Sequence, residues 1–348
     1  MEFNVTTIYD VAEESGFSVA TVSKVFNRYS GVNDKTREMV LLTARRIGYA
    51  PIQRTEAQVN KKSWLVGVIF KEDLNQGLIH PHFGGVLETF KLEMEKAGYD
   101  IIFINRNFSN QNMRYLEHCR YRNVDGALLA SSTLPEEEAV AIHHAGIKCV
   151  SVEKKYPKIP TVISTNYEGS MNALTYLYSL GHRRIGILAS PLSSLSGYER
   201  FEAYKYFLKK YNLNYDPSIV SICDTYSDGD GLKKATELIN KSKNNLPTAI
   251  FATYDKIAIV LQSMLLNRGL SVPNDISIIG FDDIEIASVS TPTLTTLRQY
   301  RSEIGRKAAD LMKRQLNNET INTSEIFRIP TELIIRDSTC RARIIERI

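Results

Sequence analysis

From Trp64 onward the sequence alternates short apolar runs with longer amphipathic segments, and this alternation restricts the fold more than any other feature. The apolar runs are LVGVIF, YDIIFIN, VDGALLA, KCVSV, TVIST, RRIGILA, TAIFA and DISIIGF. Runs of this length are typical of buried strands, and the segments between them have helical length and period. Gly98, Gly146, Gly181 and Gly269 each follow a helical segment, where a left-handed cap is needed. We therefore predict an α/β fold of doubly wound parallel sheets with helices on both faces.

The length of the chain requires more than one hydrophobic core. With 348 residues, 43% of them hydrophobic and 24% charged, the chain has the composition of a folded protein with several cores. The apolar runs are shorter than the roughly 20 residues of a membrane helix, and the start MEFNVTTIYD lacks a signal-peptide pattern. These features predict a cytoplasmic protein with no membrane partner. The four cysteines lack C-x-x-C spacing and are expected to be reduced packing residues.

The first fifty residues predict three short helices. Thr7 can cap a helix that ends at Gly16, and Ser18 is the natural cap of a second helix. Asp34 is expected to cap a third helix, which closes at Gly48. The expected buried stripe of the third helix consists of Arg37, Val40, Leu41, Ala44 and Ile47.

The first two of these helices, joined by ESGFS, have the form of a helix-turn-helix. Such a pair can place the first turn of its second helix in the major groove of DNA. Val19 and Ala20 would then contact thymine methyl groups, while Thr21, Ser23 and Lys24 would bond to bases or phosphates. From Met1 to Lys62 nine Lys or Arg stand against seven Asp or Glu, so DNA contact must depend on where the bases lie. On spacing alone, a helical cap on an enzyme remains equally possible.

The run TIYDVAEESGFSVATVSKVFN, followed by VNDKTREMVLLTARRIGYAP, closely resembles the DNA-binding headpiece of the lactose-repressor (LacI/GalR) family of bacterial transcription regulators. The resemblance implies a recognition helix from Ser18 to Asn27. It also implies a headpiece at residues 1–50 and a hinge linker at 51–63. The implied DNA-binding residues are Thr7, Tyr9, Ser18, Val19, Ala20, Thr21, Ser23, Lys24, Asn27 and Gln58.

The hinge departs from the family pattern. Family members push a leucine from this segment into the minor groove, but here Gln58 holds that place and Glu56 stands where the family often carries Arg. An apolar wedge unstacks bases and bends DNA, whereas an amide does so poorly and a carboxylate repels phosphate. Operator bending is therefore expected to be weaker than in the family.

The resemblance continues through LGHRRIGIL, SGYERFEAY, RGLSVPNDISIIGFDD and TPTLTTLRQ. It implies a body at residues 64–348 made of two Rossmann-like lobes, related to periplasmic sugar-binding proteins. The implied crossovers lie near Thr161, Thr291 and Asn322. Lobe one would then comprise about 64–161 and 292–322, and lobe two about 162–291 and 323–348.

Positions where family members contact their effector imply a small-molecule site between the lobes. These effector-binding residues are Phe83, Ser196, Arg200, Tyr226, Tyr254, Asp282 and Gln299. Their chemistry suits a sugar, because Arg donates to neighbouring hydroxyls, Asp accepts from them and an aromatic face packs on the ring. Without the resemblance, Arg200 reads as a solvated helix residue and Asp282 as a strand-end turn. Tyr254 replaces the usual Asn, and glycoside, free sugar and phosphorylated sugar all remain possible.

The remaining sequence features do not predict a metal site or a catalytic site. His80 and His82 flank Pro81 without a visible third ligand, so a loop start near the cleft is favoured over a metal site. His143 and His144 point to different sides of one helix, and GFDD offers no nucleophile and base. We expect no catalytic residues, no metal and no cofactor.

Two functional hypotheses from different classes follow. The first is a dimeric repressor that binds a double-stranded DNA operator and senses a sugar or sugar derivative. The second is a sugar-binding or sugar-modifying protein that keeps a helical amino-terminal domain. The absence of a signal peptide favours the first. Since little chain follows TELIIRDST, a homodimer without a tetramer-forming coiled coil is expected.

Overall fold

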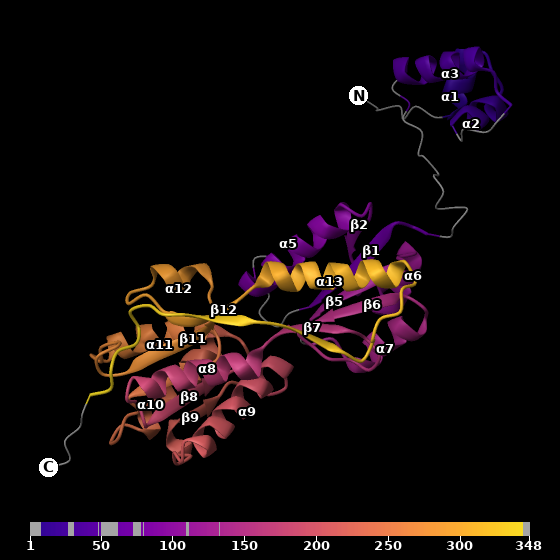
Figure 1. Ribbon diagram of the computed structural model, residues 1–348. Coiled ribbons are helices and arrows are strands. Elements are labelled where there is room, and N and C mark those ends of the chain that lie inside the picture. The colour runs from indigo at the N-terminus through magenta and orange to yellow at the C-terminus, as the bar shows by residue number, and fades with distance from the viewer. Residues whose placement is uncertain are drawn as a thin grey trace. The chain divides into compact units, whose positions relative to one another are not determined.

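The computed structural model describes residues 8–26, 31–47, 49, 62–71, 78, 80–108, 111–131 and 133–343. The chain divides into two compact units, Met1–Ser63 and Trp64–Ile348. The first is helical and the second contains two six-stranded sheets (Figure 1). The α/β class predicted from the sequence, with a helical headpiece and a two-lobed body, is confirmed.

The first unit consists of α1 (Ile8–Ser15), α2 (Val19–Phe26) and α3 (Asp34–Arg46). Gly16 has a φ of 70° between α1 and α2, a conformation that glycine adopts without strain. The Ser18 hydroxyl accepts a 3.2 Å hydrogen bond from the Thr21 amide and so caps α2, as predicted. The buried core consists of Val11, Ala12, Val22, Val25, Val40 and Ala44.

Two predictions for α3 were wrong. Its N-cap is Asn33, whose Oδ1 accepts a 2.8 Å bond from the Thr36 amide, because an extended cap residue must precede the first helical residue, which is Asp34. Leu41 is exposed and Thr43 is buried instead, because the buried face continues from Val40 towards positions three and four residues on. The predicted cap Thr7, the helix end Gly48 and the linker 51–61 lie outside the described residues.

Lobe one of the second unit is built on a fully parallel sheet in the order β13-β7-β6-β5-β1-β2. Its strands are β1 (Leu65–Lys71), β2 (Asp100–Phe103), β5 (Gly126–Ser131), β6 (Lys148–Val152), β7 (Thr161–Ser164) and β13 (Ile326–Ile329). One face is covered by α5 (Pro81–Glu95) and α13 (Arg301–Leu316), which lie side by side in Figure 1, and the other by α6 (Tyr115–Arg122) and α7 (Glu136–His144). A small hairpin of β3 (Asn107–Phe108) and β4 (Gln111–Asn112) follows β2.

Lobe two is built on a sheet in the order β14-β12-β11-β10-β8-β9, in which only β14 is antiparallel to its neighbour. Its strands are β8 (Ile185–Ala189), β9 (Val220–Ile222), β10 (Ala249–Ala252), β11 (Ser277–Asp282), β12 (Thr295–Gln299) and β14 (Thr331–Ile334). Its helices are α8 (Asn166–Ser179) and α9 (Leu195–Lys210) on one face, α10 (Asp228–Lys241) and α11 (Asp255–Asn267) on the other, the short α12 (Glu285–Val289) and a 3-10 turn, η2 (Pro217–Ile219).

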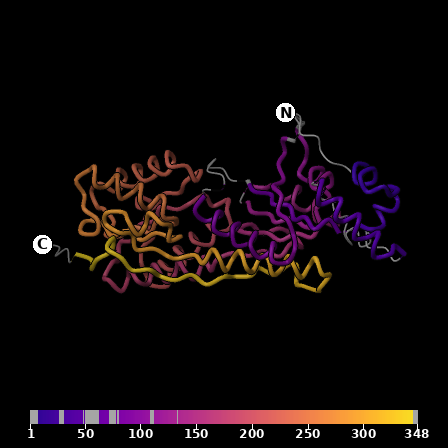
Figure 2. The backbone as a smooth tube through the Cα atoms, turned by 90° about the horizontal axis from the view of Figure 1, so that it is seen from above, coloured from indigo at the N-terminus to yellow at the C-terminus, as the bar shows by residue number. Residues whose placement is uncertain are grey.

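The strand pairing places each of the three crossovers between the lobes later in the sequence than predicted. β7 pairs in lobe one, so the first crossover lies at Thr165 rather than near Thr161. β12 pairs in lobe two and α13 packs in lobe one, so the second lies at Tyr300 rather than near Thr291. β13 pairs with β7 while β14 pairs with β12, which places the third at Pro330 instead of Asn322. Figure 2 shows this last part of the chain, in yellow, running along both lobes.

The eight predicted strands are all present, and each of the four predicted glycine caps has a positive φ. The strands that the sequence did not suggest include β12 (TTLRQ) and β13 (IFRI), whose polar residues interrupt the apolar run. None of the helices within the described residues combines the length and apolarity needed to cross a membrane.

Candidate functional site

The exposed side of the α1–α2 pair carries most of the predicted DNA-binding residues that the structure describes. Tyr9 is 69% exposed, and Ser18, Ala20 and Lys24 are also exposed. The Ser18 hydroxyl lies 3.0 Å from that of Thr21, and this contact orders two of the predicted DNA-binding residues.

Two predicted contacts on α2 are less accessible. Val19 is half-buried and packs against the core of the first unit, so only part of its side chain is free for a base contact. Ser23 is also half-buried. Thr7, Asn27 and Gln58 lie outside the described residues, so their proposed DNA contacts stay predictions.

Arg200, on α9, is the buried centre of the predicted effector site. Its side chain is 6% exposed. Nε donates a 2.9 Å hydrogen bond to the Asn166 amide oxygen, and Nη1 donates a 2.6 Å bond to the Thr253 carbonyl. The guanidinium lies 3.6 Å from the centroid of the Phe281 ring. These contacts fix the charge in a protein interior rather than in solvent, which excludes the interpretation of Arg200 as a solvated helix residue.

Asp282 stands opposite Arg200 at the end of β11, with its Oδ1 4.0 Å from Nη1 of Arg200. The same oxygen accepts a 2.5 Å hydrogen bond from Nε2 of Gln299, whose Oε1 in turn accepts a 2.6 Å bond from Ser164. Three predicted effector residues, Arg200, Asp282 and Gln299, therefore belong to one polar network at the carboxyl ends of parallel strands. This is the position where open α/β sheets bind ligands.

The backbone at Asp282 and Asp283 is held in a conformation that non-glycine residues seldom adopt, with φ values of 132° and 52°. Arg298 and Arg336 bond to the Asp283 carboxylate at 2.7 and 2.6 Å and hold the turn in place. Although burial raises the pKa of Asp283, the hydrogen bonds from these two arginines lower it overall. The turn thus presents the Asp282 carboxylate on a fixed support.

A hydroxyl cluster lies beside Arg200 in lobe two. The Ser194 hydroxyl donates to the Pro191 carbonyl at 2.9 Å, so Tyr226, whose hydroxyl lies 2.7 Å away, must donate to Ser194. Burial raises the pKa of Tyr226, and Ser196 also bonds to it. Ser196 and Tyr226 are therefore brought together as predicted.

Tyr254 departs from the expectation for this site. Its ring packs edge-on against Tyr226 at 5.4 Å, but its hydroxyl bonds to the Cys223 thiol within the core of lobe two. Burial raises the pKa of Tyr254 far above its ordinary value. Tyr254 therefore offers an aromatic edge to this region rather than a free phenol.

The lobe-one side contains Phe83, which is 6% exposed and packs against Phe70 at 5.4 Å. Next to it, His82 Nε2 lies 3.1 Å from Oε1 of Glu153, the residue that follows β6. Both side chains are 9% exposed. Burial raises the pKa of Glu153, but the charge and hydrogen bond of His82, followed by the charges of Arg200 and His80, lower it overall. The influence of Arg200 on Glu153 links the two lobes electrostatically.

Several polar residues of this region were missed by the sequence analysis: Asn166, Thr253, Glu153 and Ser164. Each of the first three follows an expected strand within two residues. In a parallel sheet that position faces the ligand end, and this signal could have found them.

Asp255 helps to hold the site in place through buried hydrogen bonds. It is fully buried, and its Oδ2 accepts a 3.0 Å bond from the Ile284 amide while Oδ1 accepts a 2.5 Å bond from Thr296. A Cβ at Gly280 would lie 2.2 Å from Oδ1, so only glycine allows this approach. Burial, and then the neighbouring Asp282, raise the pKa of Asp255 to about 7.

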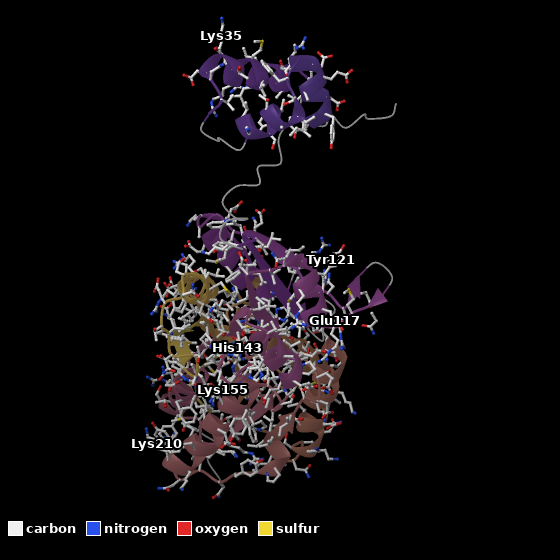
Figure 3. The ribbon with its side chains drawn as sticks, turned by 90° about the vertical axis from the view of Figure 1, so that its right-hand side faces the viewer. Lys35, Glu117, Tyr121, His143, Lys155 and Lys210 are labelled. Atoms are coloured by element: carbon white, nitrogen blue, oxygen red, sulfur yellow. The ribbon has the colours of Figure 1, made fainter. Side chains whose placement is uncertain are left out.

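The histidine pairs do not assemble a metal site within the described residues, where no group of three or more His, Cys, Asp or Glu is placed to hold an ion. His80 caps α5 through its Nδ1, as a loop-start residue does. His143, labelled in Figure 3, lies on α7. Its ring centroid is 6.0 Å from that of His144. Burial and the neighbouring His144 lower the pKa of His143.

Comparison with known proteins covers nearly the whole chain. Residues 7–51 match a family described as bacterial regulatory proteins, lacI family, and residues 174–339 match a periplasmic binding protein-like domain. The transcriptional repressor CytR of Escherichia coli (strain K12) is 30% identical over 96% of this chain and 96% of that protein. A lac repressor dimer bound to operator and the anti-inducer ONPF has a TM-score of 0.79 at 25% identity, covering 96% and 99% of the two chains. A complex of the transcriptional regulator CelR with cellobiose has a TM-score of 0.71 at 26% identity, covering 96% of this chain and 99% of that chain.

Proposed function

This chain belongs to the lacI family of bacterial regulatory proteins, and from that premise we propose that it is a homodimeric repressor whose operator affinity is set by a sugar-like effector between its lobes. DNA binding by a helix-turn-helix and control by a small ligand are typical of the family. The observation that carries the effector assignment is the pair formed by the buried Arg200 and the partly buried Asp282, in which a fixed donor and a fixed acceptor face each other at 4.0 Å. Adjacent hydroxyl groups of a sugar can bond to both.

We propose that α2 is the recognition helix. Its exposed residues Ala20 and Lys24 stand beside the ordered hydroxyls of Ser18 and Thr21, so small apolar and polar groups share one surface. Such a surface suits thymine methyl groups and phosphates together. Thr7, Tyr9, Ser23, Asn27 and Gln58 complete the proposed set.

Exposed apolar side chains on the outer side of lobe two support the proposed dimer. Ile286 and Val289 of α12 are 49% and 71% exposed, and Leu266 at the end of α11 is 49% exposed. Isolated exposed apolar residues are common on protein surfaces, but two on one short helix are suited to a contact across the two-fold axis of a dimer. CelR and the lac repressor are named with cellobiose and with ONPF, so sugars and glycosides are the first ligands to test.

We propose binding without catalysis, in the cytoplasm, with no metal or cofactor. The relatives named above are regulators.

The experiment measures fluorescence polarisation of DNA from the region upstream of the chain's own coding sequence. The full chain is expected to bind it and the chain without residues 1–62 is not, while both bind effector. Specific operator binding by the shortened chain would overturn the headpiece assignment. A thermal-shift screen over sugars identifies the effector, because a ligand at 100 times its Kd adds about 2.7 kcal/mol of stability.

A further inference from the structure

Arg328 and Glu199 form an ion pair that joins the two lobes. Arg328 lies on β13 in lobe one, and Glu199 lies on α9 in lobe two. Nη1 of Arg328 donates a 2.9 Å hydrogen bond to Oε2 of Glu199, and Nη2 donates a 2.5 Å bond to Oε1. The two side chains are 33% and 12% exposed. A bidentate pair fixes the direction as well as the distance between its partners, so it can hold one lobe against the other.

This ion pair lies beside two of the crossovers between the lobes. The third crossover follows Arg328 by two residues. At the first crossover, the Thr165 amide donates a 2.9 Å bond to the Ile329 carbonyl, and the Thr165 hydroxyl accepts a 3.1 Å bond from the Thr331 amide. Because the main chain joins the lobes at the crossovers, a rotation of one lobe against the other takes place there. The ion pair is therefore positioned to restrain such a rotation.

Asn166 connects the ion pair to the proposed effector site. It directly follows the first crossover and is fully buried. Its amide oxygen accepts the bond from Nε of Arg200, while its Nδ2 faces Oε2 of Glu199 at 3.5 Å. Since a guanidinium only donates hydrogen bonds and a carboxylate only accepts them, these two neighbours permit a single orientation of the amide. Glu199 therefore determines which atom Asn166 presents to Arg200.

A second carboxylate of lobe two also faces Arg328. The hydrogen bond with Glu199 raises the pKa of Arg328 although burial lowers it, and the charges of Glu199 and Glu168 act in the same direction as the bond. Glu168 is an exposed residue of α8. The guanidinium from lobe one is thus held by acidic residues from two helices of lobe two.

Resting on the proposed function, we propose that Glu199 and Arg328 act as a latch between the lobes and as positioning residues for Arg200. The latch stabilises the lobe arrangement in which β13 reaches α9, and through Asn166 it fixes the orientation of the Arg200 side chain. Neither residue of the latch is itself proposed to contact effector. Release of the latch favours other lobe arrangements and leaves Arg200 less well oriented, and a donor that is not fixed in advance binds hydroxyls more weakly.

Hydrogen exchange of the full chain, followed by mass spectrometry, tests the latch without DNA or ligand. In Arg328→Gln and in Glu199→Gln, the amides at the first and third crossovers are expected to exchange about fivefold faster than in wild type, because their opening loses one restraint. The amides of β10, inside lobe two, should exchange as in wild type. The double variant should behave like either single variant, because both substitutions remove the same contact.

Arg184→Gln is the matched control for these variants. Arg184 and Asp216 also form a short ion pair, with side chains 25% and 32% exposed, but both residues lie in lobe two. This variant should leave exchange at the crossovers unchanged. Wild-type exchange in Arg328→Gln would overturn the latch, and so would additive effects of the two single substitutions or an equal change in the control.

A conservative variant keeps the test decisive if Glu199→Gln does not fold. Arg328→Lys keeps the charge but loses the paired hydrogen bonds, so its exchange at the crossovers is expected to lie between that of wild type and that of Arg328→Gln. Exchange in Arg328→Lys equal to that in wild type would show that the bidentate contact does not restrain the lobes.

Sugar binding tests the positioning role. Calorimetric titration begins with cellobiose and continues with the other sugars that raise the melting temperature of wild type. Arg328→Gln is expected to weaken binding about fivefold, but the same substitution should have a smaller effect in an Asn166→Ala background, because the path to Arg200 is already broken there. Equal losses in the two backgrounds, or no loss in either, would overturn the positioning role. A chain that binds no operator overturns the proposed function, while hydrogen exchange still decides the latch.

Discussion

Nη2 of Arg301, in the first turn of α13 in lobe one, donates a 2.7 Å hydrogen bond to the main-chain carbonyl of Asp282 in lobe two. The same nitrogen bonds to the Asp283 carbonyl at 3.0 Å. Because the Asp282 carboxylate belongs to the proposed effector site, one residue connects that site to the other lobe. A ligand can shift an equilibrium between lobe arrangements only through contacts that differ between them, and this bond is one candidate.

Arg301→Ala is expected to lower the free energy of unfolding by about 1 to 3 kcal/mol, because two carbonyls of a strained turn lose their donor. Effector should also change operator affinity less than in wild type. Urea unfolding followed by circular dichroism and operator titrations with and without effector measure the two effects. Arg306→Ala is the control, since Arg306 lies on the same helix and pairs with Glu303 one turn away. Equal behaviour of the two variants would show that the inter-lobe bond is unimportant.

Arg200→Ala is expected to weaken effector binding by on the order of 2 to 4 kcal/mol, because ligand hydroxyls and Asp282 lose a buried partner. Operator binding without effector should remain near wild type. Calorimetric titration with the ligand from the screen gives the affinity, and circular dichroism checks folding, since Asn166 also loses its partner. Unchanged effector affinity would remove Arg200 from the site.

Most of the apolar strands could be predicted from the sequence because they are buried on both faces and form continuous apolar runs, whereas the edge strand β2 is partly exposed. β12 could not, since Arg298 and two threonines break the run and bond to Asp283, Asp255 and the chain near β14. The second and third crossovers were misplaced for the same reason, because they depend on which sheet β12 and β13 join. Tertiary pairing decides which sheet these strands join, and the local sequence pattern does not predict this pairing.

The effector site, like the fold, could be predicted only in part from the sequence. Arg200, Asp282 and Gln299 were found by resemblance and lie in one network. Glu153 was missed because a single acidic residue after a strand is ordinarily a solvated turn, and only its contact with His82 makes it a buried group. Tyr254 was expected to contact effector, but its hydroxyl bonds to Cys223, and the two residues follow different strands, β10 and β9.

Lys24→Ala is expected to weaken operator binding at all sequences alike and to reduce the slope of log affinity against log salt by about 1, because one phosphate contact is lost. Polarisation titrations at several salt concentrations measure the slope. Lys209→Ala, an exposed lysine of α9 in the body, should leave it unchanged. A change in base preference without a change in slope would instead assign Lys24 to a base edge.

Val289→Lys is expected to produce monomers, because Val289 is 71% exposed and a lysine in a two-fold contact would face its own copy or nearby apolar residues. Operator affinity should fall with dimer content, since one recognition helix makes too few contacts for specific binding. Sedimentation velocity measures the oligomeric state. Tyr206→Lys on α9, which also replaces an exposed apolar side chain, is the control. A Val289→Lys dimer of wild-type strength would move the interface elsewhere.

The burial of Asp255 predicts how the free energy of unfolding changes with pH. Its pKa is raised to about 7, so the folded chain binds this proton more tightly than the unfolded chain does. The resulting stabilisation is fully present below the ordinary pKa of about 4 and is lost as pH rises through 7. Asp255→Asn has no proton to bind and lacks this dependence.

The difference in unfolding free energy between wild type and Asp255→Asn should therefore move in favour of wild type as pH falls from 8 to 5. The lowered pKa values of Glu153 and Asp283 act in the opposite direction, but both proteins contain these groups, so their contribution cancels in the difference. The amide also meets the Ile284 N–H, a cost that is the same at every pH. Urea unfolding of both full-length chains across this range measures the difference. A constant difference, or one that favours the variant at low pH, would show that Asp255 is ionised in the folded protein throughout.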